Sequence, residues 1–166
     1  MKLNKILTAC GLALSCSLGF AGTTNGILLV QAEVAGACTL DVVNINFGVV
    51  SVAAGKSGEA TSTGKIITNC TKDTIYTIKL GSGNSGNFTG DRVMTSANVA
   101  NTSKLHYNIY KQNTSSIFGD GSSGTVTVEK TATGEAQEEI IQAKIPYSQA
   151  VSADKYSDSL AVIIEY

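Results

Sequence analysis

Few residues of this 166-residue chain have types and spacings that could support catalysis. The single histidine, His106, offers no set of imidazoles for a metal centre and little basis for a Ser-His-Asp enzyme. Asp154 and Asp158 flank Tyr156 and could form an acid–base pair of carboxylates, but no other residue supports that role. We therefore predict that the chain is not an enzyme and uses no cofactor or metal.

Three glycine-containing stretches resemble ligand-binding loops only in part. Residues 81–86 (GSGNSG) match the dinucleotide fingerprint after a predicted strand, but turn-forming residues follow them where a helix is required. Residues 55–57 (GKS) lack the leading glycine of a phosphate loop, because Val50 stands in its place. Residues 119–124 (GDGSSG) lack the spaced acidic ligands of a calcium loop. No small-molecule substrate is expected.

Length and charge narrow the class of protein further. A chain of 166 residues fits one domain and can bury a sizeable core. Charged residues make up 15% of the chain and the formal net charge is -1, so there is no broad basic surface for nucleic acid or anionic lipid. These numbers favour a packed domain that acts by contact.

The first residues have the three-part pattern of a secretory signal peptide. A basic start (residues 1–5) precedes an apolar run (residues 6–18) and a small-residue end at Ala21. The run is short for a membrane span. We predict a signal peptide over residues 1–21, with a later cleavage after Ala32 as the alternative, and export of the rest.

Two of the four cysteines lie inside that signal. Cys10 and Cys16 each follow a weak lipoprotein-like stretch, and lipidation is the less favoured interpretation. In an exported chain the remaining pair, Cys38 and Cys70, predicts a disulfide, with two buried thiols as the alternative. Closing this loop would stabilise the fold by roughly 3–4 kcal/mol in the chain-entropy model.

The rest of the chain has the period-two alternation of half-buried strands between turn-forming residues. The predicted strands are 41–50, 65–70, 74–80, 104–111, 125–129 and 160–166. Their number and spacing predict an all-β antiparallel sandwich.

One segment gives conflicting signals. Residues 135–144 (EAQEEIIQAK) contain good helix formers, with acidic residues early and a basic residue late. As a strand, the same segment would place Glu139, Ile141, Ala143 and Ile145 on one face. We predict a strand, because tertiary context often overrides local propensity.

The segment before Cys38 has an alternating apolar face. Leu28, Val30, Ala32 and Val34 share one side of a predicted strand within residues 26–36. It could be the first strand of its own domain, or a strand lent to a neighbouring subunit. Periodicity alone does not decide between the two.

An ordered set of short motifs carries a family resemblance across nearly the whole exported chain. In chain order they are Cys38, NFG (46–48), TGKIITNCT (63–71), Tyr76, RVM (92–94), LHYNIY (105–110), FGDGSSGT (118–125) and YSDSLAVIIEY (156–166). The chain resembles the spore coat protein U domain family, which includes pilin subunits of archaic, Csu-type chaperone–usher pili. Phe118 departs from the Trp seen in many members, and residues 138–145 match only loosely.

The resemblance implies an incomplete immunoglobulin-like sandwich that lacks its last strand and is completed by donor-strand exchange. Residues 22–36 would be the donor extension and residues 37–166 the pilin domain. The donor side chains would be Leu28, Val30, Ala32 and Val34. The acceptor groove would include Leu160, Val162, Ile164 and Tyr166. The Cys38–Cys70 disulfide would join early strands.

The resemblance also implies partners and a location. A periplasmic chaperone would fill the groove first, and the donor of another copy or related pilin would replace it at the outer-membrane usher. The product would be a head-to-tail filament on the cell surface that supports adhesion and biofilm formation. A secreted spore or cell-surface coat protein is the alternative. A carbohydrate-binding module is disfavoured because the chain has no Trp.

Overall fold

The computed structural model describes residues 21–86, 88 and 92–166. The predicted signal peptide therefore lies almost wholly outside the described residues. The chain divides after Glu33 into two units, and residues 21–33 of the first unit contain no helix or strand. Within the described ranges, no helix is long and apolar enough to cross a membrane.

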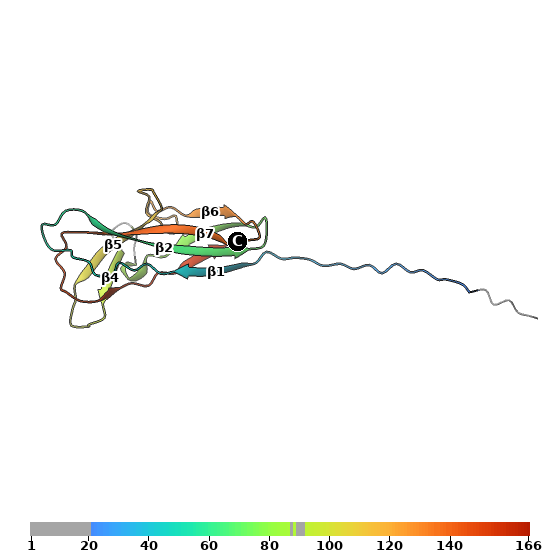
Figure 1. Ribbon diagram of the computed structural model, residues 1–166, viewed down its shortest axis with the longest axis horizontal. Coiled ribbons are helices and arrows are strands. Elements are labelled where there is room, and N and C mark those ends of the chain that lie inside the picture. Colours follow the sequence, from blue (N-terminus) through green and yellow to red (C-terminus); the bar gives the residue numbers. More distant parts are fainter. Residues whose placement is uncertain (1–20, 87, 89–91) are drawn as a thin grey trace, which may run out of the picture. The chain divides into compact units, whose positions relative to one another are not determined.

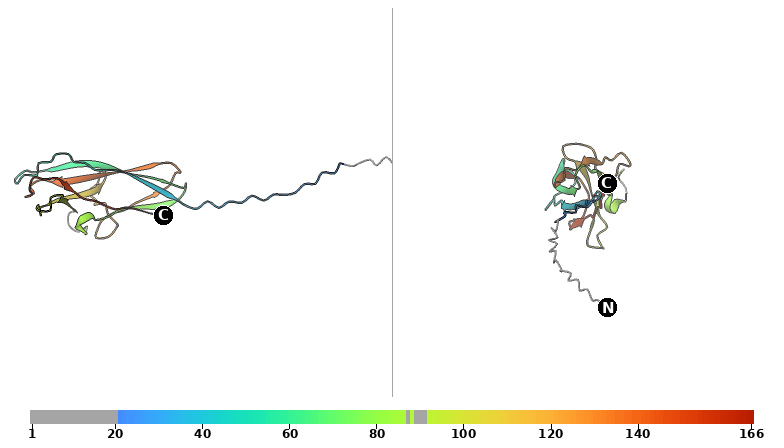
Figure 2. Two further views of the ribbon diagram at one scale, coloured as in Figure 1. Left: turned by 90° about the horizontal axis from the view of Figure 1, so that it is seen from below. Right: turned by 90° about the vertical axis from the view of Figure 1, so that its right-hand side faces the viewer.

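The second unit is a sandwich of two antiparallel sheets, as predicted (Figures 1 and 2). The larger sheet has the order β1-β2-β7-β5-β4-β8, and the smaller has the order β6-β3-β9. The strands are β1 (Cys38–Val43), β2 (Glu59–Cys70), β3 (Ile75–Leu80), β4 (Arg92–Ser96), β5 (Lys104–Lys111), β6 (Val128–Thr131), β7 (Gln137–Pro146), β8 (Tyr156–Ser157) and β9 (Val162–Glu165). A short 3-10 turn, η1 (Gly83–Ser85), precedes β4.

The core forms where the inward faces of the two sheets meet. Most predicted apolar faces are confirmed, because alternate residues of β2, β3, β5 and β7 are buried. The buried cluster contains Ile66, Cys70, Tyr76, Ile78, Leu80, Leu105, Tyr107, Ile109, Phe118, Val128, Ala132, Ile141, Ala143 and Ile145.

The segment with conflicting signals is a strand. β7 pairs with β2 along its whole length, from Glu59 opposite Pro146 to Thr68 opposite Gln137. Its alternating Ile141, Ala143 and Ile145 are buried. Tertiary pairing on both sides, by β2 and β5, overrides the local helix propensity.

The first predicted strand, residues 41–50, is wrong in its bounds. β1 begins earlier and ends at Val43, after which the chain leaves the sheet. Gly48 takes a positive φ of 64°, which shifts the alternation, so Val49 is fully exposed while Val50 packs against the core. The strands predicted at 125–129 and 160–166 are likewise displaced or shorter, as β6 and β9.

Candidate functional site

An apolar groove lies between the edges of β1 and β9. β1 pairs only with β2 and β9 only with β3, so each has an edge without a strand partner among the described residues. Val42 and Val43 of β1 and Val162 of β9 line one cavity of about 1120 Å³. An unpaired strand edge beside apolar surface is a template for another strand.

The inward face of β1 shows that the sandwich is not closed here. Leu40 pairs with Thr68 and Val42 pairs with Ile66 across the β1–β2 ladder, so all four side chains point to the same face of the sheet. Thr68 and Ile66 are 1% exposed, whereas Leu40 is 38% and Val42 is 51% exposed. The small sheet therefore covers β2 but stops short of β1.

One wall of the groove is the irregular segment that follows β1. Ile45 and Phe47 are half-buried and pack against the core. Ile45 fits because position 64 of β2 is a glycine: a Cβ there would lie 2.7 Å from Ile45 Cγ1 and 2.7 Å from the Val43 carbonyl oxygen. The Ser62 hydroxyl donates a 2.7 Å hydrogen bond to the carbonyl oxygen of Asn46. β2 thus positions this wall in two ways: Gly64 leaves room for Ile45, and the Ser62 hydroxyl binds the backbone at Asn46.

The opposite wall is the segment that leads into β9. It is formed by residues 151–160 together with Val162. Core side chains from the larger sheet and the end of β3 form the floor. The apolar floor residues are Ile66, Leu80, Met94, Leu105, Tyr107, Ile109, Ile141 and Ile145.

A polar cluster lies beside the floor of the groove. The Tyr107 hydroxyl donates a 2.7 Å hydrogen bond to Asp158 Oδ2, and both residues line the groove. Burial, with that hydrogen bond, raises the pKa of Tyr107, which stays neutral. Within the described ranges, no three His, Cys, Asp or Glu side chains are grouped to hold a metal ion.

Arg92 supports this cluster from below the surface. Its side chain is fully buried, and its guanidinium donates to the carbonyl oxygens of Gly81 and Phe118 and to Asn108 Oδ1. Burial lowers the pKa of Arg92. Because its partners are neutral carbonyl and amide groups in three separate segments, Arg92 fixes these segments relative to one another.

The predicted acceptor residues occupy different positions. Leu160 and Val162 line the groove. Ile164 is half-buried against the core. Tyr166, which follows β9, is 64% exposed and is not among the groove-lining residues.

The sequence pattern did not reveal the contribution of the β1 side. Leu40 and Val42 are uncovered on the inward face, and Ile45 and Phe47 form the wall. The only signal was the apolar alternation through Phe47, and it predicted an ordinary strand. Only the relative exposure of neighbouring strands shows that these residues border a groove.

The predicted donor residues lie on a segment that has no strand partner in the sheets. Leu28, Val30 and Val34 are all more than 80% exposed, and Ala32 is also exposed. Residues 21–37 contain no helix or strand, so they do not form a first strand of the sandwich. This segment therefore has an alternating apolar face that no part of the described chain buries.

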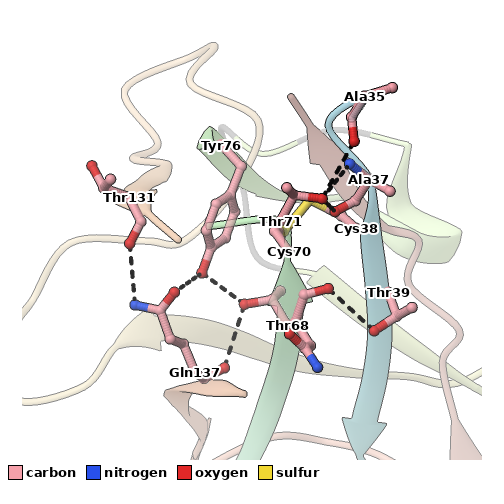
Figure 3. Close-up of a disulfide and its surroundings, with 11 residues drawn as sticks. Ala35, Ala37, Cys38, Thr39, Thr68, Cys70, Thr71, Tyr76, Thr131 and Gln137 are labelled. Carbon is pink, nitrogen blue, oxygen red and sulfur yellow. Dashed lines mark hydrogen bonds between the residues drawn. A yellow bond between two sulfur atoms is a disulfide. The ribbon is translucent and has the colours of Figure 1, made fainter. Parts of the chain in front are cut away.

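The predicted disulfide is confirmed. Cys38 and Cys70 are bonded and are directly paired across the first rung of β1 and β2 (Figure 3). Beneath it, Thr68 and Tyr76 share a 2.7 Å hydrogen bond between their hydroxyl groups. The start of β1 is thus covalently joined to the end of β2.

The fold and groove define an immunoglobulin-like all-β sandwich with an open side. A family model, described as the Spore Coat Protein U domain, matches residues 24–163. The chain belongs to this family.

Two solved structures are similar to this protein at low sequence identity. A chain in the complex of the chaperone CsuC with the tip adhesion subunit CsuE, from archaic chaperone-usher Csu pili of Acinetobacter baumannii, matches with a TM-score of 0.56 and 20% identity. The match covers 80% of this protein and 40% of that chain, so this protein spans well under half of its length. The minor tip subunit HdaB of the Escherichia coli Hda pilus matches with a TM-score of 0.46 and 17% identity, over 76% of this protein and 79% of that chain. A search of curated protein sequences gave no significant match.

Proposed function

We propose that this protein is a structural subunit of a chaperone–usher pilus and that its groove accepts residues 28–34 of a second copy or a related subunit. The observation that carries the proposal is the uncovered inward face of β1, where Leu40 and Val42 lie beside buried Ile66 and Thr68. The same chain carries an exposed alternating apolar segment that matches what this groove lacks.

Strand insertion would cover the groove between the two unpaired edges. The added strand would take backbone hydrogen bonds from β9 or β1 and place Leu28, Val30 and Val34 over the floor of the groove. Burial of each large aliphatic side chain would contribute roughly 1.5–3 kcal/mol. Because donor and acceptor are different surfaces of one subunit, the contact would be head-to-tail and would propagate a filament.

Other partners follow from the same exposed groove. Apolar surface beside a strand edge is an aggregation hazard during export, so a periplasmic chaperone would cover it before assembly at an outer-membrane usher. The similar Csu structure is a pre-assembly complex of a chaperone with a tip adhesion subunit, which supports this partner. The assembled filament would lie at the cell surface and serve adhesion and biofilm formation.

A coat protein is the second candidate, because the family model is described by a spore coat protein. Strand exchange could build a coat as well as a fibre. Electron microscopy of purified assemblies separates them: a pilus subunit gives thin unbranched filaments, and a coat protein gives sheets or amorphous layers.

Two complementary variants test strand exchange itself. Val30→Asp would place a charge on the donor face, and Val42→Asp would place one in the groove, so each variant alone should remain monomeric. Mixed together, they should form a one-to-one dimer and stop, because only the Val42→Asp subunit can donate and only the Val30→Asp subunit can accept. Size-exclusion chromatography with light scattering measures this.

Matched controls carry the same charge at exposed positions outside the contact. Leu29→Asp lies on the opposite face of the donor segment, and Val99→Asp lies at an exposed position that does not line the groove. Both should still polymerise. Polymerisation of Val30→Asp, or a failure of the two complementary variants to form a dimer, would overturn the proposal.

A further inference from the structure

The chain that leads into β1 is held by one residue, Thr71, through its backbone amide and its hydroxyl. The Ala37 amide donates a 3.1 Å hydrogen bond to Thr71 Oγ1, and the Thr71 amide donates a 2.9 Å hydrogen bond to the Ala37 carbonyl oxygen (Figure 3). Thr71 Oγ1 also lies 3.5 Å from the carbonyl oxygen of Ala35 and 3.4 Å from that of Ala37, and can donate its proton to one of them. These contacts continue the β1–β2 pairing beyond the disulfide.

The geometry of these contacts is that of an extended chain. Carbonyl groups of residues i and i+2 point to the same side in a strand, and the carbonyl oxygens of Ala35 and Ala37 both approach one hydroxyl oxygen. Gly36, between them, has no positive φ. Thr71 therefore holds residues 35–37 in line with β1.

A chain that carries both a donor segment and a groove must avoid filling its own groove. If residues 35–37 formed a three-residue hairpin loop, the preceding segment would run antiparallel to β1 along its unpaired edge, with Ala32 opposite Leu40 and Val30 opposite Val42. Directly opposite residues share a face, so the predicted donor face would cover the uncovered inward face of β1. The intramolecular contact would compete at an effective concentration in the millimolar range.

The sequence of the connection permits this hairpin. In a three-residue hairpin loop a type I turn is followed by one residue in the left-handed conformation, which here is Ala37. Alanine adopts this conformation less readily than glycine but more readily than a β-branched residue. In the present structure neither Gly36 nor Ala37 has a positive φ.

We propose that Thr71 is a positioning residue that keeps residues 35–37 extended and so prevents the chain from closing its own groove. The inference rests on the proposed strand exchange and adds a means by which the groove stays open to a second copy. The hairpin cannot form while the Ala35 and Ala37 carbonyl groups and the Ala37 amide are all directed to Thr71, because a tight turn would rotate them apart.

The test uses the exported chain and a labelled synthetic peptide of residues 24–35. Thr71→Val keeps the β-branched shape and removes the hydroxyl. It should slow capture of the peptide roughly 2- to 10-fold, the range that corresponds to one exposed hydrogen bond. Hydrogen exchange at the amides of residues 28–34 should slow in the same variant, because these residues would pair with β1.

Two further variants separate this role from a general loss of stability. Thr39→Val removes a comparable hydroxyl, which donates to the Asn69 carbonyl oxygen at 3.3 Å in the same strand pair, and should leave capture unchanged. Ala37→Val is compatible with the extended chain, because Ala37 is exposed and has no positive φ, but a β-branched residue disfavours the left-handed turn position. The double variant Thr71→Val with Ala37→Val should therefore regain the capture rate of the original chain.

Each contrary outcome has a distinct meaning. If the original chain captures the peptide and Thr71→Val behaves as Thr39→Val does, the role of Thr71 is wrong while strand exchange stands. If the original chain captures no peptide and residues 28–34 are already protected, the clamp does not keep the groove open and the inference fails. If it captures no peptide and those residues are unprotected, strand acceptance fails and the inference fails with it.

Discussion

Two neighbouring strands of the larger sheet, β2 and β1, present similar side chains inward but differ in what covers them. Ile66 and Thr68 of β2 are 1% exposed, whereas Val42 and Leu40 beside them are 51% and 38% exposed. The difference arises because the small sheet ends at β9 and does not reach β1. Side chains under the small sheet stabilise the monomer, and those beyond it would stabilise the proposed assembly.

The largest expected difference is in the free energy of unfolding, between a variant under the small sheet and a variant on β1. Ile78→Ala removes a fully buried side chain of β3 and should lower the free energy of unfolding of the monomer by about 2–5 kcal/mol. Val42→Ala should change it by less than about 1 kcal/mol, because the side chain is half-exposed before assembly. Urea titration of both monomers measures the contrast, and equal losses would show that β1 is already covered.

The disulfide should stabilise both β1 and β2, because it links them covalently. Cys38→Ser with Cys70→Ser removes the link between β1 and β2 and should lower the free energy of unfolding by roughly 2–4 kcal/mol. Differential scanning calorimetry of oxidised and reduced protein provides the same comparison without substitution. An unchanged transition on complete reduction would contradict it.

A smaller effect should appear at the wall of the groove. Gly64→Ala places a Cβ against the Val43 carbonyl oxygen and Ile45, so the wall segment must shift, at a cost of about 1–3 kcal/mol. Peptide capture should weaken with it. Gly36→Ala tests whether glycine replacement alone has this effect, because Gly36 has no positive φ and a Cβ there would make only ordinary contact, 3.5 Å from Thr74 Oγ1. An equal loss from Gly36→Ala would argue against the packing explanation.

The smallest effect concerns pH. Because burial raises the pKa of Tyr107 in the folded state, the neutral phenol is favoured there. The resulting stabilisation is complete below the ordinary pKa of 10.0 and is lost as pH rises above it. The urea midpoint should therefore fall more steeply above pH 10 in the original chain than in Tyr107→Phe. Tyr166→Phe, at an exposed position, should retain the steep fall.

Most of the sandwich could be predicted from the sequence because its strands obey a simple periodicity. Ile66, Thr68 and Cys70 are buried on one face of β2 as their alternation predicts, and the disulfide follows from the cysteine count after the predicted signal peptide. Period-two patterning works where a sheet covers one face and solvent the other.

The groove could not be predicted in full because its geometry depends on long-range contacts. The wall after β1 leaves the sheet where position 64 of another strand lacks a side chain, and no local pattern reports that contact. Arg92 is an ordinary charged residue in the sequence, yet it is buried by carbonyl groups from segments that only folding brings together. Uncovered Leu40 and buried Ile66 have the same kind of side chain, so composition alone does not distinguish them.

The position of the disulfide has a mechanical consequence. Cys38 is the first residue of β1, so tension applied through residues 35–37 reaches a covalent bond before it reaches the hydrogen bonds of β1. The load passes through Cys70 into β2, whose ladder with β7 extends from Thr68 and Gln137 to Glu59 and Pro146. That long pairing is loaded along its length, so its hydrogen bonds resist together. The edge strand β1, which would otherwise peel away under force, therefore does not carry that force.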